Sequence, residues 1–163
     1  MASIGLLVLR LALAVVFVAH GSHILFGAWG GPGTGIGFGG LSVTADYYRS
    51  LGLEPGLPLA VVAGLVQLIG GVLLGFGFLT RSASVALIAY LAVGIWKEHL
   101  KWGLFLNWTF APNQHHGIEY SLVLTAALAA LFFAGAGSLS IDGIRAQSAE
   151  SRAAGRARLR GKV

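Results

Sequence analysis

The sequence predicts an all-α integral membrane protein, an antiparallel four-helix bundle with a Gly-rich extracytoplasmic loop after the first span. Of its 163 residues, 56% are hydrophobic and only 10% are charged, whereas an average soluble domain carries about 25% charged residues. Mean hydropathy is +0.79, and four spans of about 20 residues would use roughly half of the chain. A soluble domain could not cover its surface with so few charges, so the soluble globular class is excluded.

The chain contains no cysteine. Disulfides, thiolate catalysis, iron–sulfur ligation and cysteine-based zinc sites are therefore excluded. A redox role would need an external cofactor, histidine or carboxylate ligands, or a partner chain.

The first predicted span covers residues 4–26, and Arg10 is its only formally charged residue. A cleaved signal peptide is the competing interpretation, which the long apolar run and the three later spans disfavour. Eight glycines follow within residues 27–40. They include a G-x-G-x-x-G match, but a dinucleotide site needs a strand before it and a helix after it. We therefore interpret residues 27–40 as a loop and expect a short interfacial helix at residues 42–51.

The second predicted span covers residues 57–79, after prolines that suit a helix N-terminus. Gln67 is its one strongly polar residue. Because Gly64, Gln67, Gly71 and Gly75 recur at helical spacing, they share one face, and we expect the three glycines to allow close helix packing. We expect Gln67 to hydrogen-bond a neighbouring helix, with the lining of a cavity as the alternative.

The third predicted span covers residues 83–96 and frays over residues 97–101, and the fourth covers residues 117–135. The loop between them is rich in aromatic residues, which are typical of a membrane interface. These spans and the polar remainder predict the domain organisation. A four-span domain occupies residues 1–137, and a basic, partly disordered cytoplasmic tail occupies residues 138–163.

Basic residues predict the orientation in a bacterial inner membrane. Residues 137–163 alone carry a net charge of +4, from six basic and two acidic side chains. With four spans, this tail, both termini and Arg81 share one side, which the positive-inside rule places in the cytoplasm. The Arg-rich end is expected to touch anionic lipid, and no nucleic-acid partner is expected.

This topology gathers polar side chains at the extracytoplasmic end of the bundle. All five histidines lie there together with two glutamates. Ionisable groups in a membrane are costly, so this end is the candidate functional site. The candidate ligand-binding residues are His20, His23, Gln67, Glu98, His99, His116 and Glu119, with His115 beside them.

Three interpretations of this polar end stay open. The groups can hydrogen-bond each other, the loop backbone and water at the headgroup boundary. They can also form a mouth that binds a small molecule, such as a quinone head or an oxyanion. The third interpretation is a metal or haem site with His20, His23 and His116 as weak candidate ligands. However, the familiar Glu-x-x-His pair of di-metal bundles is absent, because His116 precedes Glu119.

Two charged pairs are expected to be structural. Arg10 and Asp142 are both predicted near the inner face, where an ion pair would join the fourth span to the first. Glu119 lies within reach of the outer lysines Lys97 and Lys101, so an ion pair is expected there too.

Several short motifs resemble one known family. Arg10 and the pair His20-Gly21 lie in the first span. The second span carries Q-L-I-G-G-V-L-L-G from Gln67 to Gly75 and leads to L-T-R, while the fourth opens with G-I-E-Y and closes with G-A-G-S-L-S-I-D. In this order and spacing the motifs resemble the DoxX family of small bacterial four-helix membrane proteins, over roughly residues 4–143.

The resemblance implies an inner-membrane four-helix bundle. Some family members are linked to oxidoreductase complexes, including a subunit related to thiosulfate:quinone oxidoreductase. Others are associated with superoxide dismutase and a thiosulfate sulfurtransferase. The sequence departs from the family at Gln67, where glutamate is frequent, and at His23, where lysine is common. The first departure argues against a mechanism that needs a titratable group at this position.

We therefore predict a membrane subunit or anchor of a quinone- or thiosulfate-linked redox complex, either non-catalytic or quinone-interacting. Quinone is the candidate cofactor, and metal or haem is not expected. Besides the lipid bilayer, the candidate partners are other redox subunits or a second copy of the chain. The alternatives are a non-catalytic scaffold and, last, a small-solute or proton pathway, because few polar groups lie below Gln67.

Overall fold

The computed structural model describes residues 2–31 and 39–160, so the centre of the predicted Gly-rich loop and residues 161–163 lie outside the described residues. Within the described ranges the chain forms helices and turns and contains no strand. After the fourth helix the chain continues through a π-helical turn and a 3-10 turn. The α-helices are α1 (Ala2–Phe26), α2 (Leu41–Ser50), α3 (Gly56–Phe76), α4 (Thr80–Gly94), α5 (Glu119–Ala134) and α6 (Ile141–Arg160), and the two turns are Ile95–His99 and Leu100–Trp102.

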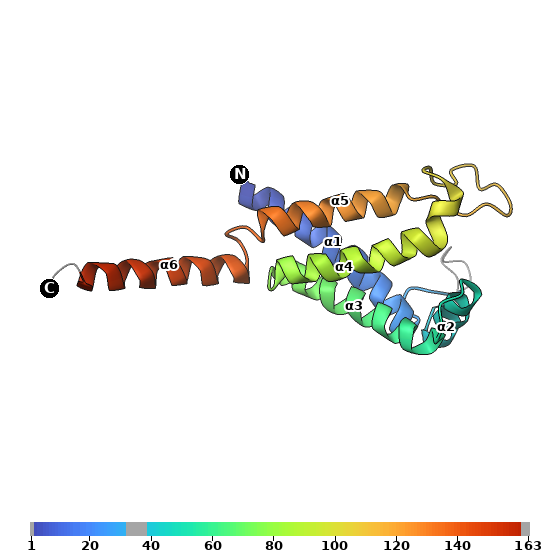
Figure 1. Ribbon diagram of the computed structural model, residues 1–163, viewed down its shortest axis with the longest axis horizontal. Helices are drawn as coiled ribbons and strands as arrows, with labels where there is room; N and C mark the ends of the chain where they lie inside the picture. Colours follow the sequence, from blue (N-terminus) through green and yellow to red (C-terminus); the bar gives the residue numbers. More distant parts are fainter. Residues whose placement is uncertain (1, 32–38, 161–163) are drawn as a thin grey trace.

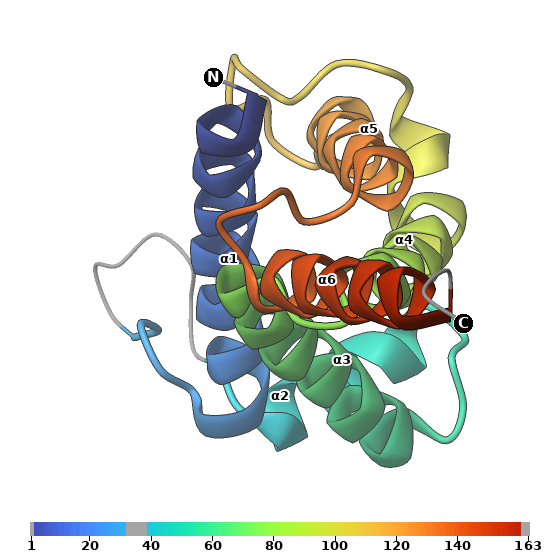
Figure 2. The same cartoon turned by 90° about the vertical axis from the view of Figure 1, so that its left-hand side faces the viewer.

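Four helices, α1, α3, α4 and α5, run alongside one another in alternating directions (Figure 1). Helix α1 packs mainly on α3, α3 packs on α4, and α4 packs on α5. At one end of these helices lie α2 and the loop of residues 103–118, and we call this the α2 end. Helix α6 projects from the opposite end, which we call the α6 end (Figures 1 and 2). The topology therefore separates the candidate polar residues of the α2 end from the basic tail.

Three helical segments are long and apolar enough to cross a membrane: α1, α3 and the continuous segment Thr80–Trp102. Helix α5 is also apolar but has only 16 residues, which corresponds to about 24 Å against a hydrocarbon core of about 30 Å. Large apolar side chains on the outer faces are exposed, among them Val15 at 69% and Ile69 at 52%. Lipid contact explains this exposure, and the chain is therefore a membrane protein.

The interior combines a leucine-rich core with close glycine contacts. A Cβ atom on Gly71 would lie 2.9 Å from the backbone nitrogen of Val18, and one on Gly64 would overlap Leu25. These two glycines thus let α1 and α3 approach closely, whereas a Cβ on Gly75 would make only an ordinary 3.4 Å contact. The core residues are Leu13, Phe17, Leu74, Ala83, Leu87, Leu91, Leu124, Leu128 and Leu131.

One segment differs from the sequence prediction. Residues 97–101 continue the helix through the π and 3-10 turns instead of fraying. Packing explains this difference, because Glu98 is buried in the π turn. In the predicted tail, the described residues form the helix α6 as far as Arg160.

Arg10 is fully buried at the α6 end and binds backbone carbonyl groups. Its guanidinium donates hydrogen bonds to the carbonyl oxygens of Leu74 at 3.3 Å and Leu139 at 2.6 Å. The last carbonyl groups of a helix lack partners within it, so the end of α3 offers natural acceptors to a cation. Gly77 provides the space for the guanidinium of Arg10, because a Cβ atom on Gly77 would overlap it.

Asp142 of α6 also binds backbone. Its carboxylate accepts hydrogen bonds from the N–H groups of Leu79 at 3.1 Å and Thr80 at 2.9 Å, and so caps the N-terminus of α4. A direct Arg10–Asp142 ion pair is not among the salt bridges of the described residues. Arg10 thus joins α1 to the end of α3 and to the connection between α5 and α6. Asp142 joins α6 to the turn between α3 and α4, so the two side chains bind backbone groups instead of each other.

Candidate functional site

A groove of about 510 Å³ lies between α2, α3 and α4 near the α2 end of the molecule. We call it the α2–α3–α4 groove. Three tyrosines line it, Tyr47 and Tyr48 from α2 and Tyr90 from α4, and its polar end carries Glu98 and His99. Most of the remaining wall is apolar, and it includes Leu51, Leu53, Leu59, Val62, Val66 and Val93. Such a wall with a few convergent polar groups is typical of a small-molecule site.

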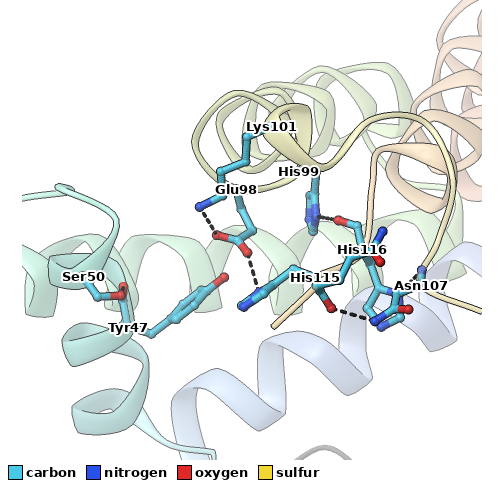
Figure 3. A network of polar contacts seen from close by, with 9 residues as sticks. Tyr47, Ser50, Glu98, His99, Lys101, Asn107, His115 and His116 are labelled. Atoms are coloured by element: carbon cyan, nitrogen blue, oxygen red, sulfur yellow. Dashed lines mark hydrogen bonds and ion pairs between the residues drawn. The ribbon is translucent and has the colours of Figure 1, made fainter. Parts of the chain in front are cut away.

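A second cavity of about 380 Å³, the polar pocket, adjoins the groove. Tyr47, Glu98 and His99 line both cavities and form their common wall. The other side of the polar pocket comes from the loop of residues 103–118, through Gln114, His115 and His116. Figure 3 shows the side chains of this region, with Glu98 between Tyr47 on one side and His115 on the other.

Glu98 is the centre of this arrangement. Its side chain is 8% exposed, and its Oε1 atom lies 2.9 Å from Nδ1 of His115. Its Oε2 atom lies 3.8 Å from Nζ of Lys101, a side chain that is 55% exposed. The ring of His115 also stacks on Trp102, with centroids 5.0 Å apart and planes inclined by 10°. The π turn thus directs one buried carboxylate toward groups from three parts of the chain, and π turns are frequent at functional sites.

The two tyrosines of α2 are held in their neutral form. Burial raises the pKa of the Tyr47 hydroxyl above its usual range, and the neighbouring Glu98 carboxylate raises this pKa further. Burial also raises the pKa of Tyr48, although the hydrogen bond with Tyr90 acts in the opposite direction. Both phenols therefore keep their proton at neutral pH. Tyr47 donates its proton to the Glu98 carboxylate, whereas Tyr48 accepts the hydrogen bond from Tyr90 and keeps its own donor available.

Gln67 lies behind the groove. It is 3% exposed, and its Nε2 atom donates a 3.4 Å hydrogen bond to the carbonyl oxygen of Ala63 in its own helix. Its side chain is also a hydrogen-bonding neighbour of Tyr90, which in turn contacts Tyr48 in the same way. Gln67 thus supports the wall of the groove through a tyrosine of α4.

Asn107 organises the loop that carries the histidines. Its buried Nδ2 atom donates hydrogen bonds to the carbonyl oxygens of Ala111 at 3.1 Å and Gln114 at 2.7 Å. Its backbone N–H donates to Nδ1 of His116 at 3.0 Å, and the carbonyl oxygen of His116 lies 3.0 Å from Nδ1 of His99. These contacts hold the loop over the π turn (Figure 3).

Three of the candidate histidines meet in a further cavity. His20, His99 and His116 line a space of about 360 Å³ between α1, the π turn and the start of α5, together with Tyr120 and Ser121. No group of three or more histidine and acidic side chains has the geometry to hold a metal ion in the part of the chain that the structure describes. The histidine, tyrosine and serine side chains that line this cavity can form hydrogen bonds.

Two candidate residues have local roles instead. His23 lies apart from these cavities, and its Nδ1 atom is 2.9 Å from the carbonyl oxygen of Ala28, which fixes the exit of α1. Glu119 accepts a 3.1 Å hydrogen bond from the backbone N–H of Leu106. The expected pair between Glu119 and a lysine is not among the salt bridges of the described residues, and Lys101 lies beside Glu98 instead. An acidic side chain at a helix N-terminus is favoured there by the helix dipole.

The sequence interpretation missed the aromatic part of the site. Tyr47, Tyr48 and Tyr90 line the groove, and Trp102 supports His115, yet none of these was a candidate. A signal was present in the adjacent pair Tyr47-Tyr48 of the short predicted helix, since tyrosine favours the membrane interface. Nothing in the sequence, however, showed that this helix would pack against α3.

Comparison with known proteins agrees with this architecture. The DoxX family model matches residues 5–100, a stretch that contains α1 to α4 and the π turn. No curated protein and no solved structure matches the chain. The family match covers more than half of the sequence and includes every residue that lines the groove. The chain therefore belongs to the DoxX family.

Proposed function

We propose that this protein is a membrane subunit of a redox-linked complex and that it binds a quinone-type ligand in the α2–α3–α4 groove. The observation that carries this proposal is the change from apolar to polar side chains along the α2–α3–α4 groove. The groove is walled by aliphatic side chains over most of its length and ends at Tyr47, Glu98 and His99. A ligand with a flat, oxygen-bearing head and an apolar tail has the same arrangement of a polar and an apolar part.

The residues present fit the head of a quinone. Its oxygen atoms accept hydrogen bonds, and the phenol of Tyr48 and the ammonium group of Lys97 can donate them. The tail would lie along α3 and α4 beside Leu59 and the neighbouring aliphatic residues. Membership of the DoxX family adds support, because some members are linked to quinone-dependent oxidoreductase complexes.

We further propose that four helices span a bacterial inner membrane with both chain termini in the cytoplasm. The α2 end, with the mouth of the groove, then faces the extracytoplasmic side. Helix α5 is short, but tilting of its neighbours or local thinning of the bilayer accommodates such a mismatch at a modest cost. The basic residues of α6 support this orientation through the positive-inside rule.

The contacts favour a quinone over an oxyanion such as thiosulfate. Most of the groove wall is aliphatic, and an oxyanion would lose its hydration there without compensating hydrogen bonds. A proton pathway is also disfavoured, because the interior between Gln67 and Arg10 is occupied by core residues such as Phe17, Leu74 and Leu87. A purely structural scaffold remains the competing function, and ligand binding distinguishes it.

The direct test is equilibrium binding of tritiated decylubiquinone to the protein in lipid nanodiscs, corrected for binding to empty nanodiscs. Ala89 is exposed in the wall of the groove, so Ala89→Trp fills the groove with an indole ring. We expect this variant to bind the quinone at least about tenfold more weakly, which corresponds to ~1.4 kcal/mol.

The matched control is Ala92→Trp on the same helix. Ala92 is also exposed, but it does not line the groove. We expect this variant to bind like the wild type. A scaffold without a ligand site predicts no saturable binding by the wild type, and binding elsewhere predicts equal affinities of the two variants, so either result refutes the proposal.

A further inference from the structure

Glu98 carries a buried acceptor atom with no hydrogen bond. The side chain is 8% exposed, and its Oε1 atom receives no hydrogen bond from the residues that the structure describes. His115 Nδ1 lies 2.9 Å away, yet it does not donate along a hydrogen-bond direction. The Tyr47 hydroxyl is a hydrogen-bonding neighbour of the same carboxylate, but Oε1 keeps no hydrogen bond. This atom can therefore accept a hydrogen bond from a ligand.

The position of Glu98 shows where a donor can come from. Glu98 belongs to the common wall of the α2–α3–α4 groove and the polar pocket. A head group that lies at the polar end of the groove can therefore reach this carboxylate. An ionised carboxylate accepts hydrogen bonds and donates none, whereas a quinone carbonyl also only accepts. Glu98 and the oxidised head are thus poorly matched.

The charged groups around Glu98 exclude a cationic ligand. Lys101 is 3.8 Å from the carboxylate, Lys97 lines the same end of the groove, and His115 lies on the opposite side. Among the described residues, Tyr47, His99 and His116 are the other titratable groups that line the polar pocket. Because positive charge is already present, an amine or quaternary ammonium would be repelled. A neutral hydroxyl group avoids this repulsion and still supplies the donor.

We propose that Glu98 makes the groove selective for the reduced form of its ligand, a hydroquinone or related phenol whose hydroxyl group donates a hydrogen bond to Oε1. This inference rests on the proposed function, since it assigns the preferred state of the ligand in the same groove. The Tyr48 phenol and the Lys97 ammonium group can donate to the ligand oxygen atoms in both states, and Glu98 provides the difference between them. Selectivity of this kind would retain the quinol and release the quinone.

The test compares decylubiquinol with decylubiquinone as competitors of the tritiated quinone, under anaerobic conditions in nanodiscs. Hydrogen bonds to a charged group are stronger than neutral ones, so we expect the wild type to bind the quinol about tenfold or more tightly than the quinone. In Glu98→Gln, whose amide both donates and accepts, we expect the two affinities to agree within about threefold. Asp46→Asn on α2 is the matched control, because Asp46 is paired with Arg49 at the surface, and it should keep the wild-type ratio.

A second ligand makes the test independent of any variant. The monomethyl ether of the quinol keeps the ring and tail but loses one donor, and we expect its affinity for the wild type to fall toward that of the quinone. Equal wild-type affinities for quinol and quinone would overturn the role of Glu98 and leave the groove as a quinone site. An unchanged preference in Glu98→Gln would also overturn it. Absence of saturable binding by either form would refute the proposed function itself.

Discussion

At the scale of single residues, charged side chains in this protein bind backbone groups at helix ends. Arg10 binds the carbonyl group of Leu74 near the end of α3, and Asp142 binds the N–H groups of Leu79 and Thr80 at the start of α4. Helix ends expose backbone groups that have no partner within the helix. In a membrane these groups cannot bind water, so a nearby charged side chain satisfies them.

Gly77 tests this account of Arg10. Its backbone has a φ of 64°, and a Cβ atom would overlap the guanidinium of Arg10. We expect Gly77→Ala to lower the free energy of unfolding by about 2 kcal/mol or more, because backbone strain and displacement of Arg10 both contribute. Unfolding by SDS, followed by circular dichroism, measures this change.

Gly94→Ala is the control for that measurement. Gly94 has a helical φ of −61°, and a Cβ there meets no atom within 4 Å. Alanine should leave stability unchanged or raise it by about 0.5–1 kcal/mol. Equal effects of the two substitutions would show that Gly77 does not make room for Arg10.

At the scale of elements, the π turn and α2 create the site. The segment Thr80–Trp102 is continuous, and its π turn presents Glu98 and His99 toward α2 and the loop. Helix α2 in turn contributes Tyr47 and Tyr48 and packs against α3. Without α2, the groove would lack one wall. The short helix between the first two long ones is therefore part of the groove that we propose as the ligand site.

Helix α5 is the element whose membrane role is most in need of a test. The natural absence of cysteine provides the background, so single cysteines can be introduced at the exposed positions Ser82, Thr109 and Ser148. If four helices span the membrane, an impermeant maleimide added to intact cells should label Thr109→Cys alone. Ser82→Cys and Ser148→Cys should react only after permeabilisation. Labelling of Ser148→Cys together with Thr109→Cys in intact cells would show that α5 does not cross.

At the scale of the whole molecule, hydropathy predicted the long helices well. The predicted spans at residues 4–26 and 57–79 correspond to α1 and α3, because long apolar runs have few alternatives to helices in a membrane. The gathering of Glu98, His99, His115 and His116 at one end also agrees with the structure. The gathering of these residues at one end depends on the alternating direction of successive helices. The order of the predicted spans along the chain is enough to predict this alternation.

The partners of individual side chains were harder to predict. Arg10 and Asp142 do lie at the same end, but each binds backbone atoms that no sequence pattern marks. His23 lies beside His20 in the sequence but binds the carbonyl of Ala28 instead of joining the other histidines. The groove depends on the angle at which α2 meets α3 and α4, and this angle is a property of packing.

The central claim is that the α2–α3–α4 groove holds a quinone-type ligand. Its most direct test is photolabelling of the wild-type protein in nanodiscs with an azido-quinone, followed by mass spectrometry of the labelled peptides. We predict saturable labelling of peptides from α2 and from the segment Thr80–Trp102, near Tyr47 and Glu98, and suppression of this labelling by excess decylubiquinol. Labelling confined to α1 and α5, or labelling that decylubiquinol does not suppress, would contradict the claim.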